Sequence, residues 1–579
     1  MTTTVERAAL PVSAPAPAPT ARRRRSDASV VILVVIVSIV LLLIVGYPLI
    51  TLLGTAGSTE GLAVLGQVFT KPANLRIVGN TVLLGLCVGT IGTLVGFVFA
   101  YAQVRLRFRG KRLLNLLAMI PIVAPPFAVA TAVITLFGRN GAITTGIFGW
   151  QADIYGLPGL VIVLTLSFYP VAYMNIKGML ESLDPSLDEA AAGLGAGKLR
   201  VFFTVTLPML IPGLAGSFLL LFVEGIADLA NPLVIGGDYT VLSSRAYLAV
   251  TGEYNTAAGA AYSFVILLPA VLVFLVQRYW VSRKNVVTVT GKPTGSSELI
   301  TAPSIRIPIL TLVGIVSALV VVVYATVLIG GFVKVPGVNN AFTLDHFRFV
   351  LAGLGSKAMV DTTTLALIAA PIAGILGMVI AWLVVRKLKR TAGLMDFVGM
   401  LGLAVPGTVL GIGYALAYMT PTTLFGIPLL PPLAGGAAAF AGSIAIVLVY
   451  IARSLPSGQR AGVSALQQIH PAIEEASTSL GANGATTFGK VTLPLIQAAL
   501  VTGVTFAFAR SMTTLSPIIF LTTPGTKIMT SQILAEVDSG RFGNAFAYCT
   551  VLIAIVLVVI LLINILIRKV VFRGRTHQR

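Results

Sequence analysis

The chain has 579 residues, of which 56% are hydrophobic and only 10% are charged, and its mean hydropathy is +0.95. Water-soluble domains cannot bury that much apolar surface, so the composition predicts a polytopic membrane protein. The formal net charge of +20 would also fit a nucleic-acid-binding protein. The basic residues flank apolar runs, however, so we expect contact with a lipid bilayer and not with nucleic acid.

The chain begins with a predicted tail. Residues 1–29 are rich in Ala and Pro and contain the run Arg22 to Arg25. This pattern is typical of a disordered cytoplasmic tail that ends in a positively charged membrane anchor. A cleaved signal peptide is the alternative. The apolar run that follows, 30–53, is longer than the hydrophobic part of a signal peptide and long enough to span a bilayer.

Twelve apolar runs follow one another along the chain, six in each half, and predict an all-α fold. They are 30–53, 80–101, 113–137, 157–176, 209–227 and 261–280, then 308–332, 361–385, 394–419, 436–452, 495–512 and 545–567. Some contain Pro, such as Pro125-Pro126 and Pro406, which membrane helices tolerate when neighbours satisfy the freed backbone groups. The predicted organisation is a first half at 30–280, a cytoplasmic linker at 281–306, a second half at 307–567 and a basic cytoplasmic tail at 568–579.

The distribution of Lys and Arg predicts the orientation. With the N-terminus inside, alternate loops place 29 basic residues on the cytoplasmic side and nine outside. Cytoplasmic loops carry the excess of basic residues in membrane proteins. Both termini are therefore expected in the cytoplasm.

One segment occurs twice, once in each half. Residues 181–208 and 467–494 share 11 identities in 28 ungapped positions, at a constant offset of 286. Both copies carry a Glu-Ala pair, a Gly six residues after the Glu, and a final Leu-Pro, and the residues concerned are Glu189, Ala190, Ala191, Gly195, Pro208, Glu475, Ala476, Gly481 and Pro494. We call 181–208 and 467–494 the first and second Glu-Ala segments. Such self-similarity indicates an internal duplication.

Each Glu-Ala segment is predicted to contain a short helix that needs a partner. In the first copy, Ser186 is the expected N-cap, and Asp188 and Glu189 fall in the first turn, where the helix dipole favours acids. Gly195 is expected to end the helix. So short a helix is not stable alone in water, so we expect it to pack on another protein. In the second copy His470 replaces Asp184, a change that we expect to tune docking.

The duplication extends upstream of the Glu-Ala segments. The stretch from Ala100 to Arg105 matches the stretch from Ala381 to Arg386, and Pro125 matches Pro406, at an offset of 281. Six spans per half give both halves the same orientation, related by a pseudo-twofold axis along the membrane normal. Such a parallel repeat excludes the inverted design of many secondary carriers but not carriers with parallel halves. The pore is expected between the halves.

Both Glu-Ala segments resemble the EAA loop of the membrane subunits of binding-protein-dependent ABC importers. The resemblance implies a type I importer permease with both halves fused, located in the bacterial inner membrane. It implies two ATPase subunits docked through the short helices, and an extracytoplasmic substrate-binding protein, periplasmic or lipid-anchored, as a further partner. The residues carried over as ATPase-coupling residues are Glu189, Ala190, Ala191, Gly195, Glu475, Ala476 and Gly481.

Signals of catalysis are weak in this sequence. Cys87 and Cys549 lie in different predicted spans, and the three histidines lack the spacing of metal ligands. Residues 484–490 fit the pattern of a phosphate-binding loop, but Val491 stands where a Ser or Thr would bind magnesium, and no strand precedes it. We therefore expect a transport subunit without a cofactor or ATPase activity of its own.

Three charges inside or beside predicted spans mark the expected translocation pathway. Glu224 and Asp228 lie four residues apart, hence on one helix face, and Arg510 occupies the duplicate position of Glu224. A charge at bilayer depth is costly and should face the protein interior or a partner. Our hypothesis is that Glu224 and Arg510 line or close the pathway, with an ion pair between them as one form of it. The alternative is that the spans end early and the charges lie at the external interface.

The expected substrate is ferric iron, on resemblance alone. The stretches Ala509 to Phe520 and Asp228 to Pro232 resemble the fused permeases of ferric iron importers. Similar fused chains handle phosphonates, sugar phosphates and thiamine, and these substrates remain open. A proton-coupled carrier would account for twelve spans and buried charges, but not for two Glu-Ala segments at identical spacing.

Overall fold

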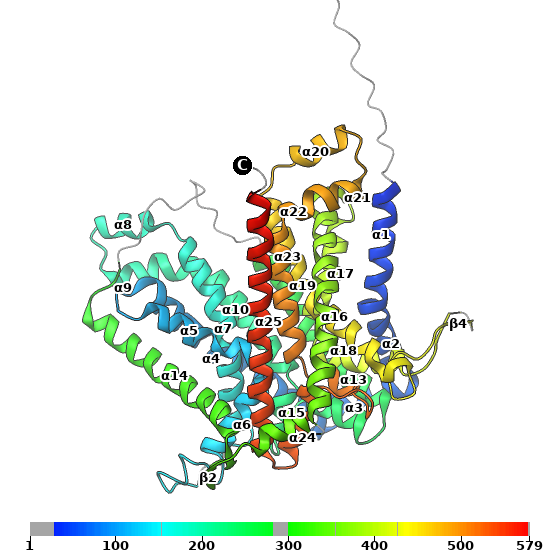
Figure 1. Ribbon diagram of the computed structural model, residues 1–579. Coiled ribbons are helices and arrows are strands. Elements are labelled where there is room, and N and C mark those ends of the chain that lie inside the picture. Colours follow the sequence, from blue (N-terminus) through cyan, green and yellow to red (C-terminus); the bar gives the residue numbers. More distant parts are fainter. Residues whose placement is uncertain (1–27, 152, 282–298, 354, 425–426, 577–579) are drawn as a thin grey trace, which may run out of the picture.

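The computed structural model describes residues 28–151, 153–281, 299–353, 355–424 and 427–576 (Figure 1). Residues 1–27 of the predicted N-terminal tail, 282–298 of the predicted linker and 577–579 of the predicted C-terminal tail lie outside the described residues.

Helices dominate the described chain, as predicted. Nine segments are long and apolar enough to cross a membrane. They contain α1 (Ala28–Leu41) with η1 (Leu42–Gly46) and α2 (Tyr47–Ala56), α4 (Pro72–Arg105), α7 (Leu157–Ser182), α9 (Lys198–Val201) with η2 (Phe202–Thr206) and α10 (Leu207–Ala227), α13 (Thr256–Val276) with η3 (Gln277–Val281), α14 (Pro303–Gly330), α16 (Gly355–Trp382) with η5 (Leu383–Lys387), η6 (Ala439–Gly442) with α19 (Ser443–Gln467), and α25 (Phe542–Thr576).

Three further candidate spans are bent pairs of helices, so the described chain has between nine and twelve spans. The pairs are α5 (Lys111–Val123) with α6 (Pro126–Phe137), bent by 104°, α17 (Ala392–Ala404) with α18 (Gly407–Tyr418), bent by 102°, and α21 (Gly484–Thr487), η7 (Phe488–Thr492) and α22 (Leu493–Leu495) with α23 (Gln497–Thr513), bent by 81°. The predicted spans 113–137 and 394–419 each correspond to one bent pair, with Pro125 and Pro406 at the bends. Ala124 and Val405 precede prolines and adopt extended backbone, because a following proline disfavours the helical region.

Shorter elements connect the long helices. They are α3 (Thr59–Thr70), α8 (Pro185–Gly193), α11 (Ala230–Ile235), α12 (Leu242–Thr251), α15 (Asp345–Ala352), α20 (Ala472–Ser479), η8 (Ile518–Phe520), α24 (Met529–Asp538) and the antiparallel hairpins β1 (Val333–Val335) with β2 (Asn339–Phe342) and β3 (Thr422–Leu424) with β4 (Ile427–Leu430). Figure 1 places α8, α20, the start of α1 and the end of α25 at one end, and α3, α15, α24 and β2 at the other.

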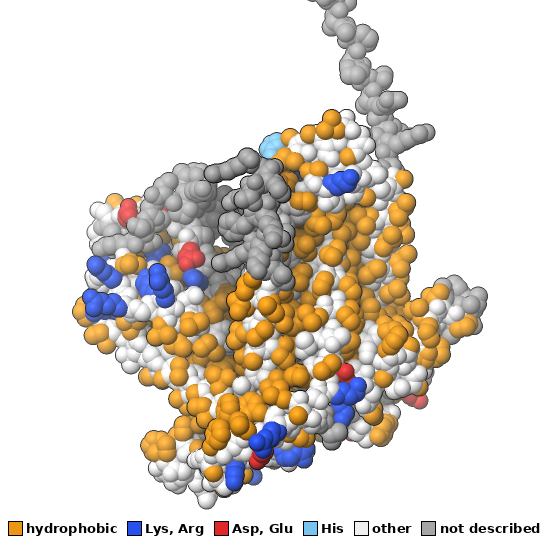
Figure 2. Space-filling model, viewed as in Figure 1, with side chains coloured by type: hydrophobic (Ala, Val, Ile, Leu, Met, Phe, Trp, Pro, Cys, Tyr) orange, Lys and Arg blue, Asp and Glu red, His pale blue; other side chains and the backbone are white. Residues whose placement is uncertain are grey.

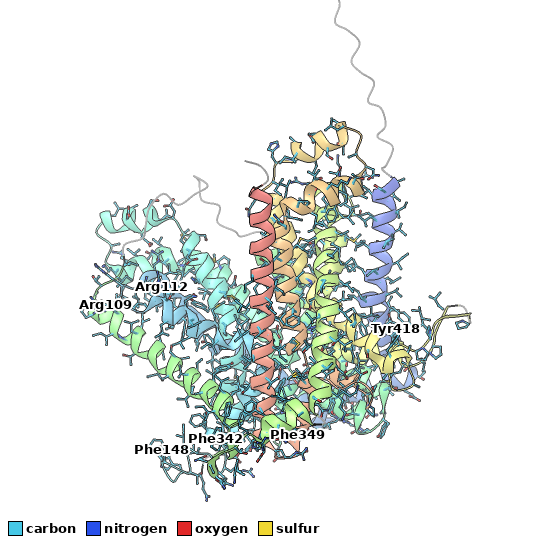
Figure 3. The ribbon with its side chains drawn as sticks, in the orientation of Figure 1. Arg109, Arg112, Phe148, Phe342, Phe349 and Tyr418 are labelled. Atoms are coloured by element: carbon cyan, nitrogen blue, oxygen red, sulfur yellow. The ribbon has the colours of Figure 1, made fainter. Side chains whose placement is uncertain are left out.

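The surface follows the same division. Figure 2 shows hydrophobic side chains covering the side of the bundle, including α25, with Lys and Arg gathered toward the ends. Arg109 and Arg112 lie toward the end that carries α8, whereas Phe148 and Phe342 lie at the opposite end (Figure 3). An apolar belt between charged ends is the surface expected of a protein that spans a bilayer.

The internal duplication is visible in the packing. In the first half α4 packs against α7 and α10, and in the second half α16 packs against α19 and α23. Gly96 and Gly377 occupy duplicate positions at these crossings, and a Cβ on either would approach the facing helix to 2.6 and 2.7 Å. Small residues let membrane helices approach closely, so both halves use the same glycine for the same crossing.

The first helix of each half packs across the boundary between the halves. α1, η1 and α2 contact α17, α18 and α19 of the second half, while α14 contacts α4, α5 and α6 of the first half in addition to α25. Tyr414 and Tyr418 donate their hydroxyls to the backbone oxygens of Ile44 and Leu43, both at 2.6 Å. Pro48 has no N–H to offer Ile44, so Tyr414 satisfies a carbonyl that would otherwise lack a partner.

We expect Tyr414→Phe and Tyr418→Phe each to lower the free energy of unfolding by about 0.6 kcal/mol, the average for hydrogen bonds between membrane helices, and by at most about 1.7 kcal/mol. Each change leaves a carbonyl of η1 without its donor. Tyr450→Phe is the control, because Tyr450 is equally buried and its hydroxyl has no partner among the described residues. Denaturant titration of the purified protein measures the effect. Equal losses in all three variants would contradict this assignment.

Candidate functional site

Both Glu-Ala segments form a helix at the same end of the molecule, α8 and α20 (Figure 1). Glu189 and Glu475 are exposed on them, as are Ala190 and Ala476, while Ala191 is half-buried. Gly195 and Gly481 follow the helices with φ of +84° and +90°, the left-handed region in which glycine is favoured. The duplicated glycines therefore supply the same turn after each helix.

The start of these helices differs from the predicted cap. α8 begins at Pro185, so Ser186 lies inside the helix, and its backbone N–H donates to Oδ1 of Asp184 at 3.0 Å. In the second copy the N–H of Ala472 donates to Nδ1 of His470 at 3.2 Å. Asp184 and His470 are duplicates, and both accept at the helix start. The prediction that Ser186 is the N-cap was wrong, because Pro185 fits the first helical position and the cap is Asp184, two residues upstream of Ser186.

An acidic residue directly before each Glu-Ala pair turns inward and anchors its helix. Asp188 forms an ion pair with Nη1 of Arg105 at 2.7 Å, and its other carboxylate oxygen accepts from Thr206 at 3.3 Å. The side chain of Arg105 is only 7% exposed. Arg105 is the last residue of α4, so this contact fixes α8 to the end of a long helix.

The second half repeats this anchor with more contacts. Glu474 accepts from Thr492 at 3.0 Å and from the indole N–H of Trp382 at 3.2 Å. Arg386 and Lys387 lie 3.6 and 3.8 Å from its carboxylate oxygens. Each member of the first anchor has a duplicate in the second. The pairs are Arg105 and Arg386, Thr206 and Thr492, and Asp188 and Glu474. In the sequence these arginines serve only to align the halves and to orient the chain. The pattern predicts Asp188 in the first turn of the helix but does not indicate its ion pair with Arg105.

The described end of the predicted linker joins the first anchor. Ile300 N–H donates to the oxygen of Arg105 at 2.8 Å, and Arg107 N–H donates to the oxygen of Ile300 at 3.1 Å. This short parallel bridge ties the chain that leads into the second half to the residue that holds α8.

Exposed apolar side chains surround both helices. Leu194 and Leu480, another duplicate pair, are each 90% exposed, and Leu187 and Ile473 are 44% and 43% exposed. Apolar side chains that stay exposed at matching places in both copies mark surfaces that bind a partner.

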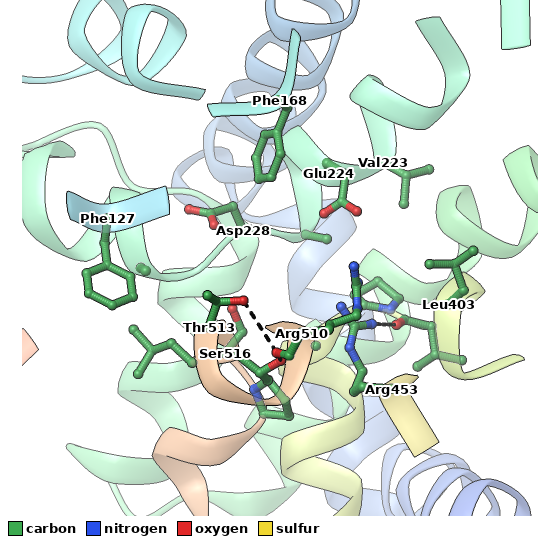
Figure 4. A pocket seen from close by; sticks show the side chains of 18 residues that line it. Phe127, Phe168, Val223, Glu224, Asp228, Leu403, Arg453, Arg510, Thr513 and Ser516 are labelled. Atoms are coloured by element: carbon green, nitrogen blue, oxygen red, sulfur yellow. Dashed lines mark hydrogen bonds between the residues drawn. The ribbon is translucent and has the colours of Figure 1, made fainter. Parts of the chain in front are cut away.

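A second candidate site is a cavity of about 150 Å³ between the halves (Figure 4). Its walls include all three charges predicted for the translocation pathway. Glu224 lies in the last turn of α10, Asp228 directly follows that helix, and Arg510 lies near the end of α23. Figure 4 shows Glu224 and Asp228 on one side of the cavity and Arg510 on the other.

The contacts of these charges differ. Asp228 accepts from the backbone N–H and side-chain amide of Asn231, at 2.9 and 3.0 Å, and so is held at the first turn of the short helix α11. Glu224 and Arg510 form no ion pair within 4.0 Å of each other or of any other described residue. Glu224 and Arg510 therefore line the cavity in this structure without forming the ion pair that the hypothesis allowed.

Arg453 is a cavity residue that the sequence analysis missed. It lies in the middle of α19, and its Nη1 donates to the oxygens of Gly402 and Val405 at 3.1 and 3.0 Å, next to the bend between α17 and α18. The predicted span 436–452 ended one residue before it. Aligning Pro456 with Pro170 would have extended the span and placed Arg453 inside the membrane.

A metal centre is not evident in the described parts of the chain, where no three His, Cys, Asp or Glu side chains are grouped so that they could hold an ion.

Comparison with known proteins gives a consistent set of similarities. The model of the family "binding-protein-dependent transport system inner membrane component" matches residues 92–286 and 373–575, one match in each half. The chain is 32% identical to the ferric transport system permease protein FbpB of Actinobacillus pleuropneumoniae over 85% of this chain and 71% of that protein. It is 31% identical to the putative ferric transport system permease protein FbpB 1 of Haemophilus influenzae over 80% and 72%. The molybdenum transport system permease protein ModB of Escherichia coli is 30% identical over 35% and 93%.

Proposed function

We propose, from the premise that this chain belongs to the family of inner membrane components of binding-protein-dependent transport systems, that it carries ferric iron across the inner membrane. The chain is the permease of such a system, not its enzyme, and membership implies an ATPase and a binding protein as partners. The substrate, the number of ATPase subunits and the orientation are our proposals.

The observation that carries iron as the substrate is the extent of the similarity. The two relatives named as ferric permeases match through both halves, over 85% and 80% of this chain. The molybdenum permease matches over 35%, which corresponds to a single half. A similarity that includes both walls of the central cavity bears more directly on the substrate than one that covers a single wall.

We propose that two ATPase subunits bind at α8 and α20, one on each. Support comes from the duplicate geometry, since each helix exposes its Glu-Ala pair, ends at a left-handed glycine and is anchored by an acid that pairs with an arginine. On this proposal α8, α20 and both termini lie in the cytoplasm, in agreement with the distribution of Lys and Arg. Closure of the ATPases would then move α8 with α4 and α20 with α16, and rock the halves about the cavity.

Uptake by the purified importer, reconstituted in liposomes with its ATPase and binding protein, tests the substrate. We expect ⁵⁵Fe(III) delivered by the binding protein to accumulate only with ATP and to be blocked by vanadate. Molybdate, phosphonate, sugar phosphate and thiamine should not accumulate. Accumulation of one of these in place of iron contradicts the proposed substrate, and uptake driven by a proton gradient without ATP contradicts the importer.

A further inference from the structure

The charges around the central cavity are divided between the halves in a way that the fold does not require. Glu224 and Asp228 come from the first half, and Arg453 and Arg510 come from the second. At an offset of 286, the duplicate of Arg453 is Ser167 and the duplicate of Arg510 is Glu224. The same helices thus pack in the first half with a hydroxyl and a carboxylate at these places, so helix packing alone does not demand the two guanidinium groups.

Both guanidinium groups keep donors that the protein does not use. The Nε atoms of Arg453 and Arg510 are buried, and neither has a hydrogen-bond partner among the described residues. Arg453 uses Nη1 for the carbonyls of Gly402 and Val405, and the side chain of Arg510 forms no hydrogen bond to any described residue. A buried cation whose donors lack acceptors is unfavourable, so this wall of the cavity is built for an acceptor from outside the chain.

The acids of the cavity do not fill that role. The carboxylate of Asp228 accepts hydrogen bonds from Asn231 on the first-half wall. The carboxylate oxygens of Glu224 lie more than 4.0 Å from the guanidinium nitrogens of both Arg453 and Arg510. Two hydroxyls of the second-half wall, on Thr513 and Thr514, donate to backbone oxygens within α23. The side-chain hydroxyl of Ser516 also lines the cavity and forms no hydrogen bond to a described residue, so it is available as a further donor.

The chemistry of the free donors defines the ligand class. The two Nη groups of Arg510 form no hydrogen bond to a described residue, and adjacent N–H groups of a guanidinium form a planar fork that matches two oxygens of one anion. One water molecule needs about 10–15 Å³ of such space, so a cavity of about 150 Å³ has room for an ion with several oxygens. A bare metal cation would be repelled by this wall and attracted by the opposite one.

We infer that Arg453 and Arg510 form a binding subsite for an oxyanion in the translocation pathway. The inference rests on the proposed function, because it takes the cavity as part of that pathway. The oxyanion arrives either alone or as a ligand of the transported metal ion, and in the second case Glu224 faces the metal. The acidic first-half wall then faces the metal cation and the basic second-half wall faces its oxyanion ligand. Two identical walls could not bind both parts of such a complex, whose net charge is close to zero.

Double-label uptake tests the subsite and separates the two sources of the oxyanion. The probe is inorganic [³³P]phosphate, supplied to the reconstituted importer with the binding protein loaded with ⁵⁵Fe(III). If the anion enters as a metal ligand, both labels accumulate in a fixed ratio. If it enters alone, phosphate accumulates without iron, which supports the subsite and overturns iron as the substrate. Iron uptake that is unchanged when phosphate and other oxyanions are omitted overturns the subsite and leaves the proposed function standing.

Variants at Arg510 show whether the guanidinium fork itself binds. Arg510→Gln should lower accumulation of the oxyanion label at least tenfold, and Arg510→Lys, which keeps the charge but loses the fork, should lower it severalfold. Arg510 suits the test because its side chain holds no other described residue in place, whereas Arg453→Gln also frees the carbonyls at the bend. Arg348→Gln is the matched control, since Arg348 is exposed, pairs with the neighbouring Asp345 and does not line the cavity. Binding of [³³P]phosphate to the permease in nanodiscs gives a readout independent of turnover. Equal binding by the parent protein and Arg510→Gln overturns the subsite.

Discussion

Replacing Glu474 with alanine is expected to lower substrate uptake about 100-fold while the permease remains folded. The change removes the shared acceptor of Arg386, Lys387, Trp382 and Thr492, all of which contact the carboxylate in the structure. Removing one partner of a buried ion pair costs about 3–5 kcal/mol, because the other charge stays buried without compensation. We expect α20 to lose its fixed position, so that ATP hydrolysis is no longer coupled to transport.

The first anchor should be weaker. The side chain of Asp188 is 26% exposed, against 8% for Glu474, so solvent screens its pair with Arg105 more effectively. Asp188→Ala is therefore expected to reduce uptake by a smaller factor, on the order of tenfold. Glu474→Gln should lie between the two, since its single amide oxygen can still accept from Trp382 or Thr492 but the charge is lost.

The measurement compares uptake with ATP turnover in the reconstituted complex. Glu181→Gln is the control, because Glu181 forms an exposed pair at 3.9 Å with Lys177 and its duplicate is already Gln467. It should leave both activities unchanged. A single monodisperse peak in size-exclusion chromatography shows that Glu474→Ala is still folded under the assay conditions, so that the loss comes from the position of α20. Normal coupled uptake with both acids replaced would remove the basis for treating α8 and α20 as the coupling elements.

Reversing one charge in the central cavity should be nearly as damaging. Glu224→Arg and Arg510→Glu each change the charge of the cavity by two, and both are expected to lower uptake at least tenfold. Unit charges about 6 Å apart interact by about 3 kcal/mol at the effective dielectric constant of 20 that is typical of proteins. The exchange of the two residues restores the total charge and should recover part of the uptake.

An exposed pair provides the control for this exchange. Arg139 and Asp153 lie 2.9 Å apart with side chains that are 72% and 58% exposed. Exposed ion pairs contribute about 0–1 kcal/mol, so exchanging these residues should leave uptake within about twofold. If each single reversal at Glu224 and Arg510 were equally harmless, the cavity would not be on the transport path.

The features that could be predicted from sequence depend on composition and on short motifs. Hydropathy predicted helices across the membrane, and the constant offset between the Glu-Ala segments predicted two equivalent halves with a short helix in each. The three predicted charges lie around one cavity because Glu224 and Arg510 are duplicates at the ends of duplicate helices. A periodic or repeated pattern is a local property of the chain, so it can be recognised without knowing which segments pack against it.

What the tertiary structure decided involves contacts between distant residues. Asp188 and Glu189 are adjacent acids on one short helix, and no local rule shows that Asp188 turns inward to Arg105 while Glu189 stays exposed. The hydroxyl of Tyr414 bonds to Ile44 across 370 residues, and so reveals that the first helix of one half packs on the other. Arg453 is a cavity residue only because α19 continues past the predicted end of its span.

The sequence by itself determined that this is a duplicated membrane protein with a matching short helix in each half, because apolar composition and repeated motifs are properties of the chain alone. Only the tertiary structure decided which charges are anchors, which is a cap and which line the cavity. The physical reason is that the energy of a charge depends on its burial and its partners, and both are set by segments that meet only after folding.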